Sequence, residues 1–200
     1  MPSISEQRTS LLDLLVQKSL TFGEVSLASG EKSGVYVDGK LTTCFPSAMP
    51  LIGNLFLNEI STRGWSPEAV GGLTLGADPI AFAIARESLN TPSMISAFVV
   101  RKDAKEHGKK KSIEGIDPRG RAVVIIDDVC TKGGSTGQAI EKAREAGMNV
   151  LGAICLVDRQ QGATEMLREQ FGCELASIFK LSELVRRHEE IKHGAPLAVA

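Results

Sequence analysis

The chain has 200 residues, of which 42% are hydrophobic and 24% charged, and its formal net charge is −1. This length fits one domain, the composition is that of a globular protein, and the near-neutral charge argues against attraction of the whole surface to nucleic acid or anionic membranes. No apolar run is long enough to cross a bilayer and residues 1–10 lack the features of a secretory signal, so we expect a cytoplasmic protein that binds neither membrane nor nucleic acid.

The first third of the chain is predicted to form a helix, two strands and a second helix. Apolar residues recur at helical spacing over Ser5–Ser19, and the first residue of this range is the expected N-cap. Two short strands follow, around Phe22–Leu27 and Val35–Val37, joined by a turn rich in serine and glycine. A second helix is expected from Ser47 to about Arg63.

From residue 69 onward, short β-rich runs alternate with helical stretches, which predicts right-handed crossovers and a mostly parallel sheet. One run, Val123–Ile126, is apolar at every position, as expected for a strand covered on both faces. We predict one α/β domain over 1–200, with a small N-terminal hood mainly within 1–45, a core at about 46–190 and a flexible tail at 194–200. The predicted strands are Ala69–Gly72, Met94–Val100, Ala122–Ile126, Val150–Val157 and Leu175–Phe179, and the predicted helices are Ala77–Ser88, Gly137–Ala146, Thr164–Gln170 and Leu181–Glu190.

The four cysteines show no CxxC spacing, so we expect reduced thiols rather than a zinc site or a disulfide framework.

A candidate ligand site follows the all-apolar run. Asp127 and Asp128 come first, then a loop with hydroxyls and glycines, then a predicted helix. Ligands of open α/β sheets bind at the carboxyl ends of strands, and glycines and a helix N-terminus favour anions, so Thr131–Thr136 is a plausible phosphate cradle. The carboxylates would repel phosphate but suit sugar hydroxyls or hydrated Mg²⁺. The plain alternative is a helix start capped by Ser135 beside two exposed aspartates.

A second candidate is the basic segment at 101–111, which holds six Lys or Arg residues against two acidic ones. Such a loop suits a polyanion such as pyrophosphate, whose departure it would assist by neutralising charge. The alternatives are a solvated charge run or a nucleic-acid patch, although no aromatic residues interleave the charges.

The run Asp-Asp-Val-x-Thr-x-Gly-Gly-Ser at 127–135 resembles the phosphoribosyl pyrophosphate (PRPP) signature of the type I phosphoribosyltransferases. The resemblance implies a mostly parallel sheet flanked by helices, with a small hood. It also implies that the loop holds the 5-phosphate and that the acidic pair holds the ribose hydroxyls. The implied PRPP contacts here are Asp127, Asp128, Val129, Cys130, Thr131, Lys132, Gly133, Gly134 and Ser135.

The basic segment resembles the flexible catalytic loop of the orotate branch of that family. The resemblance places Arg101, Lys102, Lys105 and His107 on the pyrophosphate side of the site. It also implies a homodimer, because in that branch part of the 101–111 loop reaches into the neighbouring subunit's site.

Three further stretches are similar to the same branch: 27–38, in the hood beside the base; 71–80, a pyrophosphate-binding turn; and Arg159, for the orotate carboxylate. An arginine fork suits a carboxylate, although an ordinary ion pair with Asp158 is the alternative. Thr131 is also implied at the base, and Tyr36 either stacks on it or fills core. Some members carry a lysine where this chain has Ala28, a role that Lys32 is a candidate to fill.

The expected activity is that of a glycosyltransferase of pyrimidine biosynthesis. The enzyme would transfer phosphoribose from PRPP to orotate, giving orotidine 5′-monophosphate and pyrophosphate. Mg²⁺ is expected to be held through PRPP and water, with no direct protein ligand. The alternatives are a phosphoribosyltransferase for another base and a non-catalytic PRPP-binding regulator. The residues expected to carry catalysis are Lys102, Lys105, His107, Asp127 and Asp128.

Overall fold

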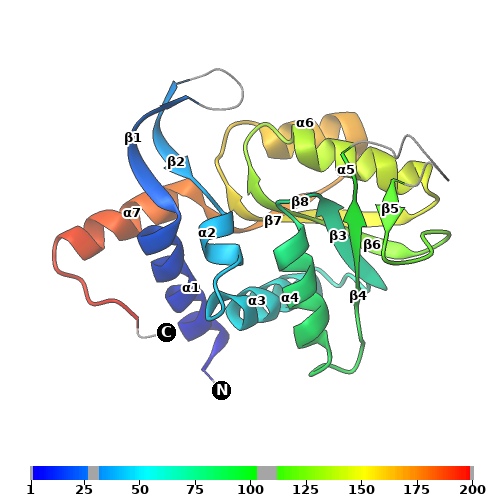
Figure 1. Ribbon diagram of the computed structural model, residues 1–200, viewed down its shortest axis with the longest axis horizontal. Helices are drawn as coiled ribbons and strands as arrows, with labels where there is room; N and C mark the ends of the chain where they lie inside the picture. Colours follow the sequence, from blue (N-terminus) through cyan, green and yellow to red (C-terminus); the bar gives the residue numbers. More distant parts are fainter. Residues whose placement is uncertain (1, 27–31, 103–111, 199–200) are drawn as a thin grey trace.

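The computed structural model describes residues 2–26, 32–102 and 112–198. Its main feature is a six-stranded sheet in the order β5-β4-β3-β6-β7-β8, and a separate sheet pairs β1 with β2 (Figure 1). All neighbouring strands of the large sheet run parallel except β4 and β5. The predicted α/β class and mostly parallel sheet are therefore confirmed.

The strands are β1 Leu20–Ser26, β2 Lys32–Val37, β3 Ala69–Leu73, β4 Ser96–Val100, β5 Ile113–Glu114, β6 Ala122–Cys130, β7 Asn149–Asp158 and β8 Leu175–Lys180. The helices are α1 Ile4–Lys18, α2 Lys40–Thr43, α3 Ala48–Thr62, α4 Asp78–Ser88, α5 Gly134–Glu145, α6 Ala163–Phe171 and α7 Leu181–Lys192. The helix α2 and the strand β5 were not predicted, because four and two residues are too few to show a period.

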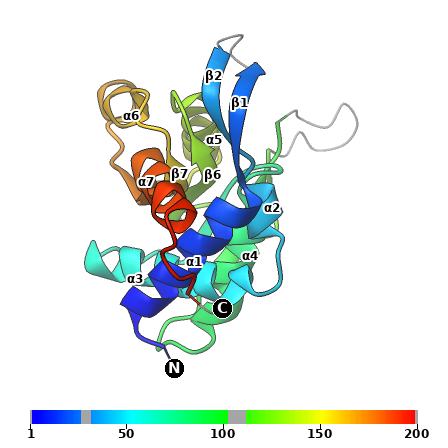
Figure 2. The ribbon, with the colours of Figure 1, turned by 90° about the vertical axis from the view of Figure 1, so that its left-hand side faces the viewer.

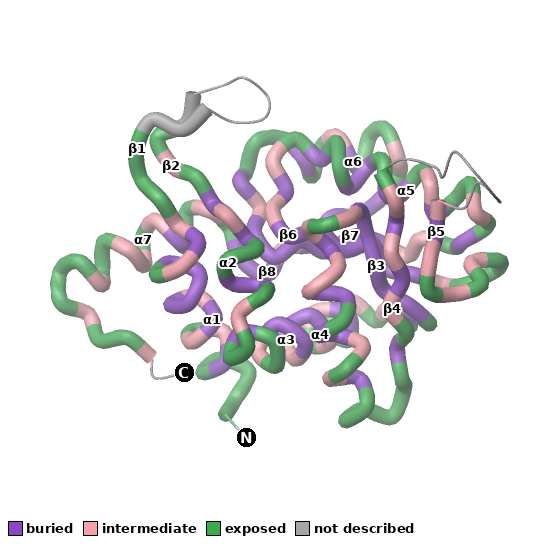
Figure 3. Tube along the Cα trace, in the orientation of Figure 1, coloured by how far each residue is buried: buried purple, intermediate pink, exposed green. Residues whose placement is uncertain are grey.

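The middle of the sheet is covered on both faces. Along β6, Val124 and Ile126 belong to the apolar cluster beneath α1, α3 and α4, whereas Val123 and Ile125 belong to the cluster beneath α5 and α6. Figure 3 shows the buried trace concentrated in these central strands. Burial on both faces explains why this run is apolar at every residue instead of alternating.

Two predicted boundaries at the centre of the sheet were wrong. The strand β6 continues past Ile126 to Cys130, because its pairing with β7 persists as far as Cys130 beside Asp158. Asp127 and Asp128 therefore lie inside the strand. The following helix starts at Gly134, three residues before the predicted start.

The cap of α1 also differs from the prediction. Ser3, not Ser5, is the N-cap, and its hydroxyl accepts a hydrogen bond from the Glu6 N–H at 3.2 Å. The Glu6 carboxylate accepts in return from the Ser3 N–H at 2.7 Å, which completes a capping box.

The β1–β2 hairpin stands apart from the large sheet, above α1 and α2 (Figure 2). The ring of Phe22 on β1 lies 4.4 Å from that of His188 on α7, so the hairpin is braced by the last helix. All four cysteines lie in the described part of the chain and are free. Among the described residues, no helix combines the length and apolar character needed to span a membrane.

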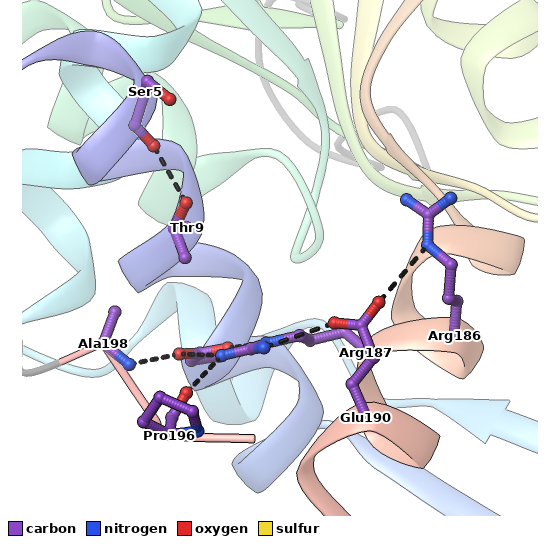
Figure 4. A network of polar contacts seen from close by, with 8 residues as sticks. Ser5, Thr9, Arg186, Arg187, Glu190, Pro196 and Ala198 are labelled. Atoms are coloured by element: carbon purple, nitrogen blue, oxygen red, sulfur yellow. Dashed lines mark hydrogen bonds and ion pairs between the residues drawn. The ribbon is translucent and has the colours of Figure 1, made fainter.

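A nearly buried ion pair joins the first and last helices (Figure 4). Arg187 Nε lies 2.6 Å from Asp13 Oδ1, and the Asp13 side chain is 1% exposed. The C-terminal segment contributes as well: the Pro196 carbonyl accepts from Arg187 at 2.7 Å, and the Ala198 N–H donates to Asp13 at 2.6 Å. Flexibility of the tail 194–200 stays a prediction.

Replacing Arg187 by Met should lower the free energy of unfolding by about 3–5 kcal/mol, because it leaves the Asp13 carboxylate buried without its cation. Urea unfolding followed by circular dichroism measures this loss. The neighbouring Arg186, whose side chain is 71% exposed, provides the matched control. Arg186→Met should stay within about 0.5 kcal/mol of wild type, and equal losses in the two variants would contradict the assignment.

Candidate active site

The acidic pair occupies the carboxyl half of β6, and each aspartate is 8% exposed. The Asp127 carboxylate accepts a hydrogen bond from the Thr136 hydroxyl at 2.6 Å and one from the Asp128 N–H at 3.0 Å. Asp128 Oδ1 accepts from the Val129 N–H at 2.9 Å, and its Oδ2 lies 3.3 Å from the Lys40 ammonium. The alternative of two exposed aspartates beside an ordinary helix start is therefore wrong.

Burial changes the charge behaviour of Asp127. Removal from water raises the pKa of this carboxyl to about 7, and the negative charge of Asp128 acts in the same direction. The hydrogen bond from Thr136 opposes the rise by stabilising the ionised form. Asp127 therefore changes its charge near neutral pH.

Two glycines from distant segments close around Asp128. A Cβ atom at Gly76, in the turn between β3 and α4, would lie 2.5 Å from Asp128 Oδ1. A Cβ at Gly39, just before α2, would lie 3.0 Å from Oδ2. The absence of side chains at these positions lets both segments approach the carboxylate.

The predicted phosphate cradle forms a small cavity of about 100 Å³ beside the acidic pair. Gly133, in the left-handed region at φ 81°, is the N-cap of α5, and as a glycine it provides no side-chain cap for this helix. Backbone N–H groups in the first turn of the helix thus suit an anion. The cavity is lined by Asp127, Val129, Cys130, Thr131, Lys132, Gly133, Gly134 and Ser135.

Thr136 differs from the predicted cradle, whereas Ser135 differs only from the plain alternative in which it caps the helix. Thr136, placed at the end of the cradle from the sequence, is 1% exposed and bonds to Asp127 instead of lining the cavity. Ser135 lies in the first turn of α5 and is not its cap.

The described part of the basic segment lies at the end of β4. Arg101 and Lys102 line a pocket of about 380 Å³ with Thr74 and Leu75 of the turn after β3, and with Val99 and Glu114. The Lys142 ammonium on α5 donates to the Arg101 carbonyl at 2.7 Å and also to the Lys102 carbonyl. The predicted catalytic residues Lys105 and His107 lie outside the described residues.

Arg159 and Tyr36 come together where the hairpin meets the core. Arg159 is 5% exposed. Its backbone N–H donates to the Cys130 carbonyl at 2.9 Å, and its side-chain Nη2 donates to the Val35 carbonyl at 3.0 Å. Burial lowers the pKa of its guanidinium, and the neighbouring Tyr36 opposes that change. Tyr36 is 37% exposed, so the alternative that it fills the core is wrong.

Several residues of this site were missed at the sequence level. Lys40, Gly39 and Lys142 reach the site or its border only through tertiary contacts, whereas Gly76 lies within the predicted pyrophosphate-binding turn at 71–80. The only feature of the sequence that could have pointed to Lys40 is its position two residues after Asp38, and this spacing alone matches no known motif for a binding site. Among the described residues, no group of three or more His, Cys, Asp or Glu side chains is placed to hold a metal ion.

Comparison with known proteins matches residues 46–176 to the phosphoribosyl transferase domain. The orotate phosphoribosyltransferase of Corynebacterium glutamicum is 42% identical over 180 residues, which covers 90% of this chain and 95% of the relative. That of Aquifex aeolicus is 42% identical over 182 residues, covering 90% and 98%.

Solved structures agree with these relatives. The Mycobacterium tuberculosis orotate phosphoribosyltransferase in complex with PRPP is 32% identical, with a TM-score of 0.72, over 89% of this chain and 91% of that one. The enzyme of the same name from Aeropyrum pernix is 31% identical, with a TM-score of 0.74, over 92% and 99%.

The raised pKa of Asp127 predicts that Asp127→Asn stabilises the folded chain at alkaline pH. Wild type should lose stability as the pH rises through the interval from the ordinary value of 3.8 to about 7, because the folded state binds the proton more tightly. The variant does not titrate, so its advantage in melting temperature should grow between about pH 5 and about pH 8.

The control is Asp117→Asn, since Asp117 is exposed and Arg119 lowers the pKa of its carboxyl. This variant should gain no stability at alkaline pH. An advantage of Asp127→Asn that stays constant across the pH range would contradict the prediction.

Proposed function

The chain belongs to the phosphoribosyl transferase family, and from that membership we propose that it works as an orotate phosphoribosyltransferase. The reaction moves the 5-phosphoribosyl group of PRPP to the ring nitrogen of orotate, giving orotidine 5′-monophosphate and pyrophosphate. It is a glycosyl transfer in pyrimidine biosynthesis. The observation that carries the proposal is the acidic pair in β6 directly beside an uncapped helix start and its small cavity.

The donor binds across this junction in our proposal. Backbone groups of Val129 to Ser135 hold the 5-phosphate, while Asp127 and Asp128 accept hydrogen bonds from the ribose hydroxyls. The separation of the two tasks is supported by charge, because the carboxylates would repel phosphate, whereas the first turn of α5 attracts it. A PRPP complex is known for the Mycobacterium tuberculosis relative.

The base binds on the hairpin side, against Arg159, Tyr36 and Thr131. A planar guanidinium forms two parallel hydrogen bonds with a carboxylate, which orotate has and purines lack. The buried position of Arg159 strengthens such a pair because little water competes for it. This observation favours orotate over another base.

Catalysis needs positioning and charge stabilisation rather than a covalent intermediate. As the bond from the anomeric carbon to pyrophosphate loosens, positive charge develops on the ribose and negative charge on the leaving group. Arg101, Lys102, Lys105 and His107 are proposed to stabilise the departing pyrophosphate, with Lys102 or His107 as proton donor. A basic segment of this kind favours an enzyme over a PRPP-binding regulator, which has no leaving group to stabilise.

Mg²⁺ is the proposed cofactor, and the donor set fits an ion that is not enclosed by the protein. The described part of the chain places no group of three or more His, Cys, Asp or Glu side chains to enclose a metal ion, so the ion would be held through diphosphate oxygens and water rather than by direct protein ligands. Asp127 and Asp128 are the residues that would accept hydrogen bonds from metal-bound water. When bound, the ion neutralises charge on the diphosphate.

We further propose a cytoplasmic homodimer that shares the 101–111 loop between subunits. Leu75, in the turn after β3, is 71% exposed, and Phe82, one turn into α4, is 53% exposed. Our proposal places these two apolar side chains in the contact between subunits. Within each subunit we propose one domain, with the hood mainly in 1–45 and the core at about 46–190.

The direct test is a spectrophotometric assay of orotate consumption with PRPP and Mg²⁺, run beside a panel of other bases. Orotate should be consumed and pyrophosphate released in equal amounts. Use of another base in preference to orotate would favour the first alternative. PRPP binding without pyrophosphate release from any base would favour a regulator.

Arg159→Lys should raise the KM for orotate by about tenfold or more, because an ammonium cannot form the paired bonds of the guanidinium. The KM for PRPP should change little. Because Arg159 also donates to the Val35 carbonyl, the melting temperature of the variant is measured alongside. A normal KM for orotate in a folded variant would remove Arg159 from the base site.

Subunit mixing tests the shared loop. Lys105→Ala should lower turnover greatly without unfolding the chain. Asp127→Asn should be inactive because it removes a carboxylate from the proposed binding site for the donor, PRPP. If the loop acts across the interface, an equal mixture after subunit exchange should recover about one quarter of wild-type activity. Lys192→Ala, at a lysine whose side chain is 65% exposed on α7, is the control for lysine removal. A mixture that stays inactive despite proven exchange would place the loop in its own subunit's site.

A further inference from the structure

Lys40 brings a positive charge to the acidic pair from a part of the chain that no motif marks. It is the first residue of α2, and its ammonium lies 3.3 Å from Asp128 Oδ2 and 3.9 Å from Asp38 Oδ1. The Lys40 side chain is 52% exposed, whereas that of Asp128 is 11% exposed. A half-exposed cation thus reaches a largely buried carboxylate.

Hydrogen bonds and packing of the residues around Lys40 position its side chain beside Asp128. The Asp38 N–H donates to the Ser19 carbonyl at 2.9 Å, and Asp38 Oδ1 accepts from the Lys40 N–H at 3.2 Å. Gly39 packs against the Asp128 carboxylate, and a side chain at position 39 would force that carboxylate to shift. The hydroxyls of Thr42 and Ser19 lie 2.7 Å apart in the interior, which ties α2 to the end of α1.

The Lys40 ammonium places a positive charge directly against the Asp128 carboxylate. Two adjacent carboxylates repel each other, and this repulsion grows as water is excluded. Asp127 has the Thr136 hydroxyl and one N–H as donors, whereas Asp128 has one N–H and the Lys40 cation. Attraction to Asp128 raises the pKa of Lys40, so the cation is present at neutral pH.

We propose that Lys40 is a positioning residue for the donor sugar: it orients the Asp128 carboxylate and offsets its charge, so that the carboxylate accepts hydrogen bonds from the ribose hydroxyls. This inference rests on the proposed function, because the sugar phosphate is the donor of that reaction. It predicts a selective effect. Lys40 governs affinity for a ligand that carries ribose hydroxyls and not for a phosphate or diphosphate alone.

Calorimetric titration of Lys40→Met with PRPP and with inorganic pyrophosphate, both with Mg²⁺ and without orotate, tests this selectivity. PRPP affinity should fall by about tenfold, equivalent to loss of one charge-assisted hydrogen bond. Pyrophosphate affinity should stay within about twofold of wild type. Lys40→Arg keeps a cation at this position and should recover most of the PRPP affinity.

Lys192→Met is the matched control, since this exposed lysine forms a 3.8 Å pair with Glu189 away from the site. Its affinity for both ligands should equal that of wild type. Unchanged PRPP affinity in folded Lys40→Met would overturn the proposal, and so would an equal loss for both ligands, which indicates contact with phosphate or general attraction. A wild-type protein that binds PRPP but never converts orotate would overturn the proposed reaction alone.

Discussion

The site depends on two carboxyl groups held inside a strand that is otherwise apolar. Burying Asp127 and Asp128 in β6 is unfavourable in free energy unless donors and a cation lie beside them. The structure provides the Thr136 hydroxyl, two backbone N–H groups and the Lys40 ammonium. Asp127 also lines the cavity of the following loop, so the groups that make its burial tolerable lie at the binding site itself.

Helix α5 couples the parts of this site. Its first turn forms the cradle, Thr136 in that turn bonds to Asp127, and two turns later Lys142 holds the carbonyls of Arg101 and Lys102. One rigid element therefore sets the phosphate cavity, the acidic pair and the start of the basic segment relative to one another. Positioning of this kind is what a reaction without a covalent intermediate requires of the protein.

Much of the fold was predictable because strands and helices of the core carry strong local signals. The all-apolar Val123–Ile126 indicated a doubly covered strand, and the alternation after residue 69 indicated a parallel sheet. The wrongly predicted boundaries lie where strand pairing or helix capping extends an element beyond its local sequence pattern. The strand β6 runs on to Cys130 because β7 pairs with it there, although two aspartates interrupt the apolar pattern. The helix α2 is too short to show a period at all.

The residues of the candidate site likewise fall into those that the sequence indicates and those that only the folded structure brings together. Its acidic pair and glycine-rich loop are contiguous in the chain, so their chemistry and order could be recognised from residues 127–135 alone. The contacts of Lys40, Gly76 and Lys142 join segments far apart in the chain, and they exist only because the packed fold brings these segments together. The amino-acid sequence determines which chemical groups are available. The burial of each group and its hydrogen-bond or ionic partner, which together set its charge state, are properties of the folded molecule.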